Sequence, residues 1–197
     1  MPRKSVSLCW RCPIADHDRP DWLAGGRRRD VAVDRIHAAA TALILERGIE
    51  AVNVDDVAAR AGCSRATLYR HVGGKAAIVD GVIARAAASV AGEVAIAIEP
   101  FDGSRRTVEA ILASVAAVRT NPVLAQWYAG SRATRADSYL AAAPQLGRFA
   151  SALTGVLPDD AAAQWIVRVV MSLLAWPLPD PAGERLIVER FVEPGLR

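Results

Sequence analysis

The sequence predicts an all-α protein, with an N-terminal three-helix unit followed by a larger helical region. Apolar residues recur along most of the chain at the spacing of amphipathic helices. Glycine, proline and short polar residues separate these stretches and set their ends. Near the N-terminus, two short helical segments meet at a glycine-containing turn, which is typical of a helix-turn-helix.

The first residues, 1–29, are expected to form a disordered arm, because prolines and the pair Gly25–Gly26 occur there without a helical or strand period. Cys9, Cys12 and His17 lie close together, but three ligands fall short of the four that structural zinc takes, and we expect no metal. The run Arg27–Arg29 is either a solvated charge run or a basic arm that reaches along a nucleic-acid backbone or minor groove.

A first helix is expected from about Asp30 to Arg47, followed by Gly48 as its terminator. His37 is expected to pack at the edge of its buried face rather than to act as a ligand. The apolar face of this helix consists of Val33, Ile36, His37, Ala40, Leu43 and Ile44.

The next segment carries the capping signals of two helices. Asn53 can cap the first of them, and Gly62 is expected to end it because glycine adopts positive φ without steric cost. Ser64 can cap the second helix, and Thr67 three residues later weakly resembles a capping box. The buried side of the first helix is formed by Val54, Val57, Ala58 and Ala61.

The second of these helices has the composition of a DNA-reading helix. In a helix-turn-helix this helix enters the major groove, and the Arg65 guanidinium can pair two donors with O6 and N7 of a guanine. Any one such residue alone indicates only a solvated surface, whereas the caps, the turn and the basic helix together indicate DNA binding. Leu68 and Val72 are expected on the core side. The expected DNA contacts, phosphate contacts included, are Ser64, Arg65, Thr67, Tyr69, Arg70, His71 and Lys75.

Residues 48–83 resemble the DNA-binding module of the TetR family of transcriptional regulators. The resemblance lies in the V-A-x-x-A-G-x-S turn, the T-L-Y-x-H recognition helix and a lysine four residues after the histidine. Many relatives have glycine or proline where Arg65 and Ala66 stand, which suggests that Arg65 is an operator-specific reader. They also have phenylalanine at the position of Val72 and polar residues in place of Gly73 and Gly74.

Helical periodicity continues through the second region of the chain. A long helix over residues 75–98 is expected to join the two regions, with its apolar stripe marked by Ile78, Val82, Ile83, Ala86, Val90 and Val94. Further helices are expected over 105–119, 123–129, 145–156, from 159–160 onward, and 184–191.

The helix that begins at Asp159 and Asp160 is apolar on more than one face, so a partner subunit is expected to cover part of it. The sequence R-V-V-M-S-L-L-A-W-P also resembles a helix of the TetR family that packs in a dimeric four-helix bundle. A two-fold dimer would place its recognition helices ~34 to 36 Å apart on a palindromic operator. The expected interface residues are Trp165, Val169, Ser172, Leu173 and Trp176.

The family resemblance also implies a small-molecule effector, bound in the helical second region, that shifts the dimer between DNA-competent and released states. Aromatic side chains can line a mostly apolar pocket, although each of them can equally belong to the core. The candidates are Phe101, Trp127, Tyr128, Tyr139 and Phe149.

Composition sets the remaining expectations. With 52% hydrophobic and 23% charged residues and a net charge of +3, the chain can bury a core and carry a local basic face. Its odd number of cysteines fits a reducing cytoplasm, and its most apolar run, 165–178, falls short of the ~20 residues that span a membrane. We expect an arm (1–29), a helix-turn-helix domain (30–76) and an effector-binding and dimerisation domain (77–197).

These patterns predict a dimeric DNA-binding regulator without a cofactor. The family resemblance implies that it responds to a ligand and that it is a repressor, since relatives of this kind are more often repressors than activators. The chain lacks the common catalytic motifs, so we do not expect an enzyme. The alternative is a helical dimer that binds another protein instead of DNA. Such a surface should carry apolar anchors, whereas residues 65–71 present mainly polar and basic side chains.

Overall fold

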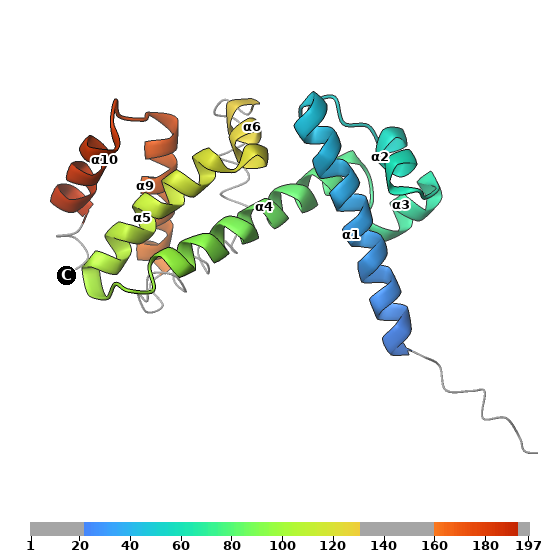
Figure 1. The fold of residues 1–197 in the computed structure, drawn as a ribbon, viewed down its shortest axis with the longest axis horizontal. Coiled ribbons are helices and arrows are strands. Elements are labelled where there is room, and N and C mark those ends of the chain that lie inside the picture. The colour runs from blue at the N-terminus through green and yellow to red at the C-terminus, as the bar shows by residue number, and fades with distance from the viewer. Residues whose placement is uncertain (1–21, 131–159, 193–197) are drawn as a thin grey trace, which may run out of the picture.

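The computed structural model describes residues 22–130 and 160–192, and all regular structure in these two ranges is helical, as predicted. Figure 1 shows α1, α2 and α3 at one end of the molecule, with α4 running from them toward α5, α9 and α10. The elements are α1 (Trp22–Arg47), α2 (Val54–Ala61), α3 (Arg65–His71), α4 (Lys75–Ala97), α5 (Gly103–Thr120), α6 (Pro122–Gly130), α9 (Asp160–Ala175), α10 (Pro181–Ile187) and a π-helical turn, η1 (Val188–Val192).

The N-terminal core forms where α1, α2 and α3 meet the first turns of α4. Leu68 of α3 is fully buried there, and the predicted apolar faces of α1 and α2 supply most of the other side chains. The buried residues include Ile36, Ala40, Leu43, Ile44, Val57, Ala58, Leu68, Ile78 and Val82. Burial of this apolar surface fixes α3 against the rest of the unit.

A close approach between α1 and α4 occurs at His37 and Gly81. His37 is buried, and a Cβ atom added to Gly81 would lie only 2.1 Å from its Nε2 atom. Any side chain at position 81 would therefore displace the imidazole. The predicted place of His37 on the buried face of α1 is confirmed.

Helix α4 belongs to both regions. Ile78 and Val82 pack in the N-terminal core, whereas Ile83, Val90 and Val94 pack in a second cluster with α5 and α6. The predicted domain boundary after residue 76 therefore falls before two residues that complete the N-terminal core. The predicted apolar stripe of α4 is confirmed, since five of its residues are buried and Ala86 packs beside them.

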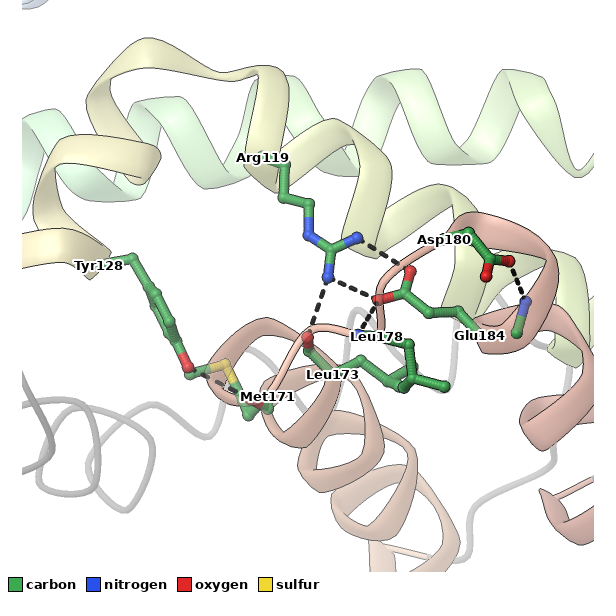
Figure 2. A network of polar contacts seen from close by, with 8 residues as sticks. Arg119, Tyr128, Met171, Leu173, Leu178, Asp180 and Glu184 are labelled. Carbon is green, nitrogen blue, oxygen red and sulfur yellow. Dashed lines mark hydrogen bonds and ion pairs between the residues drawn. The ribbon is translucent and has the colours of Figure 1, made fainter.

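A third cluster holds α9 and the C-terminal turns against α5. Its buried residues are Val108, Ile111, Val115, Ala163, Ile166, Leu173 and Val188. Arg119 of α5 adds a polar clamp (Figure 2), because its Nη1 and Nη2 atoms donate to both carboxylate oxygens of Glu184 at 2.9 and 2.7 Å. Nη2 also donates to the Leu173 carbonyl oxygen at 3.0 Å, so one guanidinium joins α5, α9 and α10.

Glu184 is buried, with a side chain only 5% exposed. Its Oε1 atom also accepts from the Leu178 amide at 3.3 Å. Hydrogen bonding to Arg119 lowers the pKa of the Glu184 carboxyl below its usual range, although burial acts in the opposite direction. The carboxylate is therefore buried as a paired, charged group.

Two predicted helix boundaries were wrong. Helix α1 begins at Trp22 instead of Asp30, so Arg27–Arg29 and the pair Gly25–Gly26 are helical rather than part of a disordered arm. Glycine within a helix costs only about 1 kcal/mol, and here it does not end the helix. The last helix begins at Pro181, where Asp180 caps it by accepting from the Gly183 amide at 2.7 Å.

The other predicted helices within the described ranges, 105–119 and 123–129, correspond to α5 and α6. Residues 1–21, with Cys9, Cys12 and His17, and the predicted helix over 145–156 lie outside the described residues.

Candidate nucleic-acid interface

The turn between α2 and α3 is built by the predicted caps. The Asn53 Oδ1 atom accepts from the Asp56 amide at 2.8 Å and begins α2. Gly62 ends it with φ of 67°, a left-handed conformation that favours glycine. The Ser64 Oγ atom then accepts from the Thr67 amide at 3.2 Å and begins α3. These bonds make a helix-turn-helix of residues 53–71.

Helix α3 divides into a buried side and an exposed side. Leu68 anchors the buried side in the N-terminal core. Arg65 and Arg70 are exposed, and Tyr69 is 50% exposed. Arg70 has no ion-pair partner within the described ranges, so its charge is available to an external anion.

Arg65 has one ion-pair partner among the residues that the structure describes. Its Nε atom lies 3.1 Å from Oδ1 of Asp55, in the first turn of α2. Both side chains are mostly exposed, at 61% and 63%. The pair involves only Nε, so within the described residues the two Nη groups of Arg65 make no hydrogen bond or ion pair.

The two hydroxyls at the start of α3 are joined to each other. Ser64 Oγ and Thr67 Oγ1 lie 3.0 Å apart, and one donates to the other. Ser64 also accepts the capping bond, so one hydroxyl proton of the pair remains to donate to a phosphate oxygen. These residues therefore combine a structural role with a capacity for phosphate contact.

His71 and Lys75 are less free than the sequence suggests. His71 is partly buried, and its Nδ1 atom is buried without a hydrogen-bond partner. The Lys75 Nζ atom donates to the backbone carbonyl of Glu50 at 2.7 Å while its side chain stays exposed. An ammonium has further N–H donors, so this bond positions Lys75 and does not exhaust it.

Sequence reasoning missed the arginines that hold α1 to α2. Arg35 Nη2 donates to the carbonyl of Ala61, the last residue of α2, at 3.0 Å. Arg47 pairs with Asp56 at 3.0 Å, and Arg60 pairs with Glu46 at 2.6 Å. Periodicity places these arginines on helix surfaces, but their partners depend on how α1 crosses α2.

The predicted effector residues do not form one group. Phe101 precedes α5, whereas Trp127 and Tyr128 follow it on α6 (Figure 1). The 18 residues of α5 separate the two positions by about 27 Å of helix. The structure therefore does not bring Phe101 together with Trp127 and Tyr128, and the effector pocket stays a prediction. Tyr139 and Phe149 lie outside the described residues.

Trp127 is partly buried and packs on the cluster between α4, α5 and α6. The Tyr128 hydroxyl donates to the Met171 carbonyl of α9 at 3.2 Å (Figure 2). Phe101 instead lies beneath the Arg105 guanidinium, with 5.4 Å between the Cζ atom and the ring centroid.

The expected dimer residues differ in their exposure to solvent. Trp165 and Trp176 are 39% and 76% exposed, and Ser172 is exposed. Val169 is partly buried, and Leu173 is buried within the protomer, so Leu173 already packs in the core between α5 and α9. Sequence reasoning missed three exposed apolar side chains nearby, Leu186, Ile187 and Phe191.

Residues 22–130 and 160–192 contain no group of three or more His, Cys, Asp or Glu side chains that could hold a metal ion. No single helix in these ranges is long and apolar enough to cross a membrane, although Gly103–Thr120 and Pro122–Ala129, bent by 85°, are together long and apolar enough.

Known proteins similar to this chain are bacterial regulators. The family described as "Bacterial regulatory proteins, tetR family" matches residues 36–82. Two Mycobacterium tuberculosis proteins, named uncharacterized HTH-type transcriptional regulators MT1294 and Rv1255c, are each 33% identical over 181 residues, which cover 88% of this chain and 89% of theirs. The Bacillus subtilis protein named uncharacterized HTH-type transcriptional regulator YdeS is 46% identical over 55 residues, 27% of this chain and 28% of its own.

A solved structure shares the fold. The TetR family repressor AlkX from Dietzia sp. strain DQ12-45-1b, implicated in biodegradation of n-alkanes, superposes with a TM-score of 0.59. It is 23% identical, and the match covers 85% of this chain and 94% of AlkX.

The helix-turn-helix and these relatives define a DNA-binding transcriptional regulator. The chain belongs to the TetR family. Its relatives are regulators, in agreement with the prediction that it is not an enzyme.

Proposed function

We propose that this regulator is a ligand-responsive repressor that acts in the cytoplasm and binds a palindromic operator as a homodimer. The observation that carries the proposal is the exposed basic side of α3, where Arg65, Tyr69 and Arg70 lie opposite the buried anchor Leu68. Members of this family act more often as repressors than as activators, so we propose repression rather than activation.

On the DNA, we assign base reading to Arg65 and backbone contacts mainly to the hydroxyl, imidazole and ammonium groups. The Arg65 Nη groups can donate together to O6 and N7 of one guanine. Phosphate contacts fix the register of the protein without reading sequence. The proposed contact residues are Ser64, Arg65, Thr67, Tyr69, Arg70, His71 and Lys75.

Dimerisation is supported by large apolar side chains that stay exposed in the protomer. Trp165, Trp176, Leu186, Ile187 and Phe191 are between 38% and 76% exposed, on α9, on α10 and in the turns that follow them. Aromatic residues are enriched at protein interfaces, and exposed apolar area favours association. A two-fold dimer built on these helices presents two copies of α3 to one palindrome.

Effector response is supported by the position of α6. Val123 of α6 packs in the N-terminal core, whereas Leu124 and Trp127 pack on the cluster that includes the middle of α4. A small molecule that contacts Trp127 or Tyr128 would therefore act on a helix that contacts both regions. A typical coupling would change operator affinity by about 1 to 3 kcal/mol.

Hydroxyl-radical footprinting on the DNA that flanks the gene tests the dimer and the palindrome. Two protected half-sites of inverted sequence, centred ~34 to 36 Å apart, are expected. A single protected half-site, or half-sites in direct repeat, would overturn the two-fold arrangement.

A further inference from the structure

Asp55 is the side chain that contacts the proposed base reader. It lies in the first turn of α2, and its Oδ1 atom is 3.1 Å from Nε of Arg65, the first residue of α3. The two residues therefore join the two helices of the motif beside the surface assigned to DNA.

The neighbouring carboxylate, Asp56, is used differently. Its Oδ2 atom pairs with Arg47 of α1 at 3.0 Å and accepts from the Asn53 amide group at 3.0 Å. Both carboxylates lie at the positive end of α2, so both favour that helix. Only the partner distinguishes them, because Asp56 holds α2 to α1 whereas Asp55 holds Arg65.

The Asp55 pair contributes little to folding. Both side chains are more than 60% exposed, and exposed ion pairs are typically worth less than about 1 kcal/mol. A carboxylate beside a DNA-binding helix also repels phosphate groups. Beyond its favourable place in the first turn of α2, Asp55 therefore contributes little to folding, and its contact with Arg65 is available for recognition.

The contact suits base reading because it leaves the outer donors of the guanidinium free. The Asp55 carboxylate lies beside Nε, and the two Nη groups carry N–H donors that can bond to O6 and N7 of a guanine. An arginine side chain has many rotamers, and holding one of them before binding reduces the entropy lost in the complex.

We propose that Asp55 is a positioning residue for DNA sequence recognition: it orients Arg65 toward one guanine and lowers affinity for DNA that lacks this base. The inference rests on the proposed role of Arg65 as the base reader. In the absence of the correct base, Arg65 keeps its ion pair with Asp55, and the carboxylate charge disfavours a complex held by phosphate contacts alone.

The test compares Asp55→Asn with Asp56→Asn, which removes the same charge from the same helical turn. Fluorescence anisotropy at ~0.15 M salt measures binding of each dimeric variant to the operator, to operators with single base-pair substitutions, and to scrambled DNA. Circular dichroism checks that both variants fold.

Both variants should bind scrambled DNA more tightly than the wild type. Asp55→Asn alone should reduce discrimination at the base pair read by Arg65, by about two- to fivefold, the range that an exposed ion pair is worth. Combined with Arg65→Ala, it should cause no further loss of discrimination there.

Two results would overturn the proposal, and they differ in whether the proposed function of Arg65 fails as well. If Arg65→Ala loses discrimination at one base pair while Asp55→Asn keeps it, Arg65 reads DNA without Asp55, and the proposed function survives. If Arg65→Ala loses discrimination at no base pair, the assignment of Arg65 fails and the role of Asp55 fails with it.

Discussion

Arginines serve different purposes in the two halves of this molecule. Around α2 and α3, Arg65 and Arg70 are exposed, and within the described ranges Arg65 makes only an exposed ion pair with Asp55. Around α5 and α10, Arg119 and Arg185 each bind both oxygens of a carboxylate, Glu184 and Glu109 respectively.

This comparison shows how the same side chain is directed to recognition or to stability. Glu184 and Glu109 are only 5% and 15% exposed, so their arginines satisfy carboxylates that solvent reaches poorly. Asp55 is well solvated and needs no partner for folding. Substitutions of arginine should therefore damage folding in one half and DNA binding in the other.

The largest effect is expected for Arg119→Met, which leaves the buried Glu184 carboxylate without its main partner. Loss of one partner of a buried pair costs about 3 to 5 kcal/mol, and the 36% exposure of Arg119 reduces our expectation to about 2 to 4 kcal/mol. Urea denaturation measures this loss. Arg168→Met is the control, because within the described residues the Arg168 side chain hydrogen-bonds only to Gln164, one turn away on α9. Equal stability of the two variants would contradict a stabilising role for the Arg119 clamp.

Gly81→Ala tests the close contact between α1 and α4. The new Cβ atom would lie 2.1 Å from His37 Nε2, so we expect a loss of about 1 to 3 kcal/mol in unfolding free energy. Gly92→Ala is the matched control on the same helix, because its Cβ atom would meet nothing within 4 Å. Adding His37→Ala should recover part of the loss. If the effects of His37→Ala and Gly81→Ala are strictly additive, the two residues are not in contact.

Arg65→Ala should leave stability almost unchanged and weaken operator binding by about 1 to 3 kcal/mol, with relaxed preference at one base pair. Lys75→Ala is the comparison variant, since loss of a phosphate contact weakens binding to all sequences and lowers the salt slope by about one. Anisotropy titrations over a series of salt concentrations distinguish these two patterns. A uniform loss of binding in Arg65→Ala would make Arg65 a phosphate contact.

The smallest effect is expected from the titration of His37. Burial and the nearby Arg85 guanidinium lower the pKa of His37 below its ordinary 6.5, although Asp34 acts in the opposite direction. The unfolded chain therefore binds this proton more readily, and the stabilising contribution is complete above pH 6.5 and is lost as the pH falls through the folded-state pKa. Urea denaturation at several pH values should show a shallower loss for His37→Gln than for the wild type. Parallel pH profiles would refute the assignment to His37.

The helix-turn-helix could be predicted from the sequence because its signals are local. Asn53 and Ser64 each cap an amide three residues away, and Gly62 ends α2 by its own conformation. The apolar stripes of α1 and α4 likewise depend on one helical period. Such features need no knowledge of which helices pack together.

The polar clamps could not be predicted, because Arg119 and Glu184 are 65 residues apart and Arg185 and Glu109 are 76 apart. Periodicity places each side chain on a face of its helix but does not say which face of another helix meets it. Composition grouped Phe101 with Trp127 for the same reason. The long path of α5 separates them in space.

The most direct measurement titrates wild-type protein, Arg65→Ala and Arg119→Met into the same labelled DNA from beside the gene, with excess scrambled competitor. We predict competitor-resistant binding by the wild type, strongly weakened binding by Arg65→Ala, and near-wild-type binding by Arg119→Met below its melting temperature. Binding that scrambled DNA abolishes in the wild type, or equal binding by Arg65→Ala and the wild type, would contradict sequence recognition by the exposed side of α3.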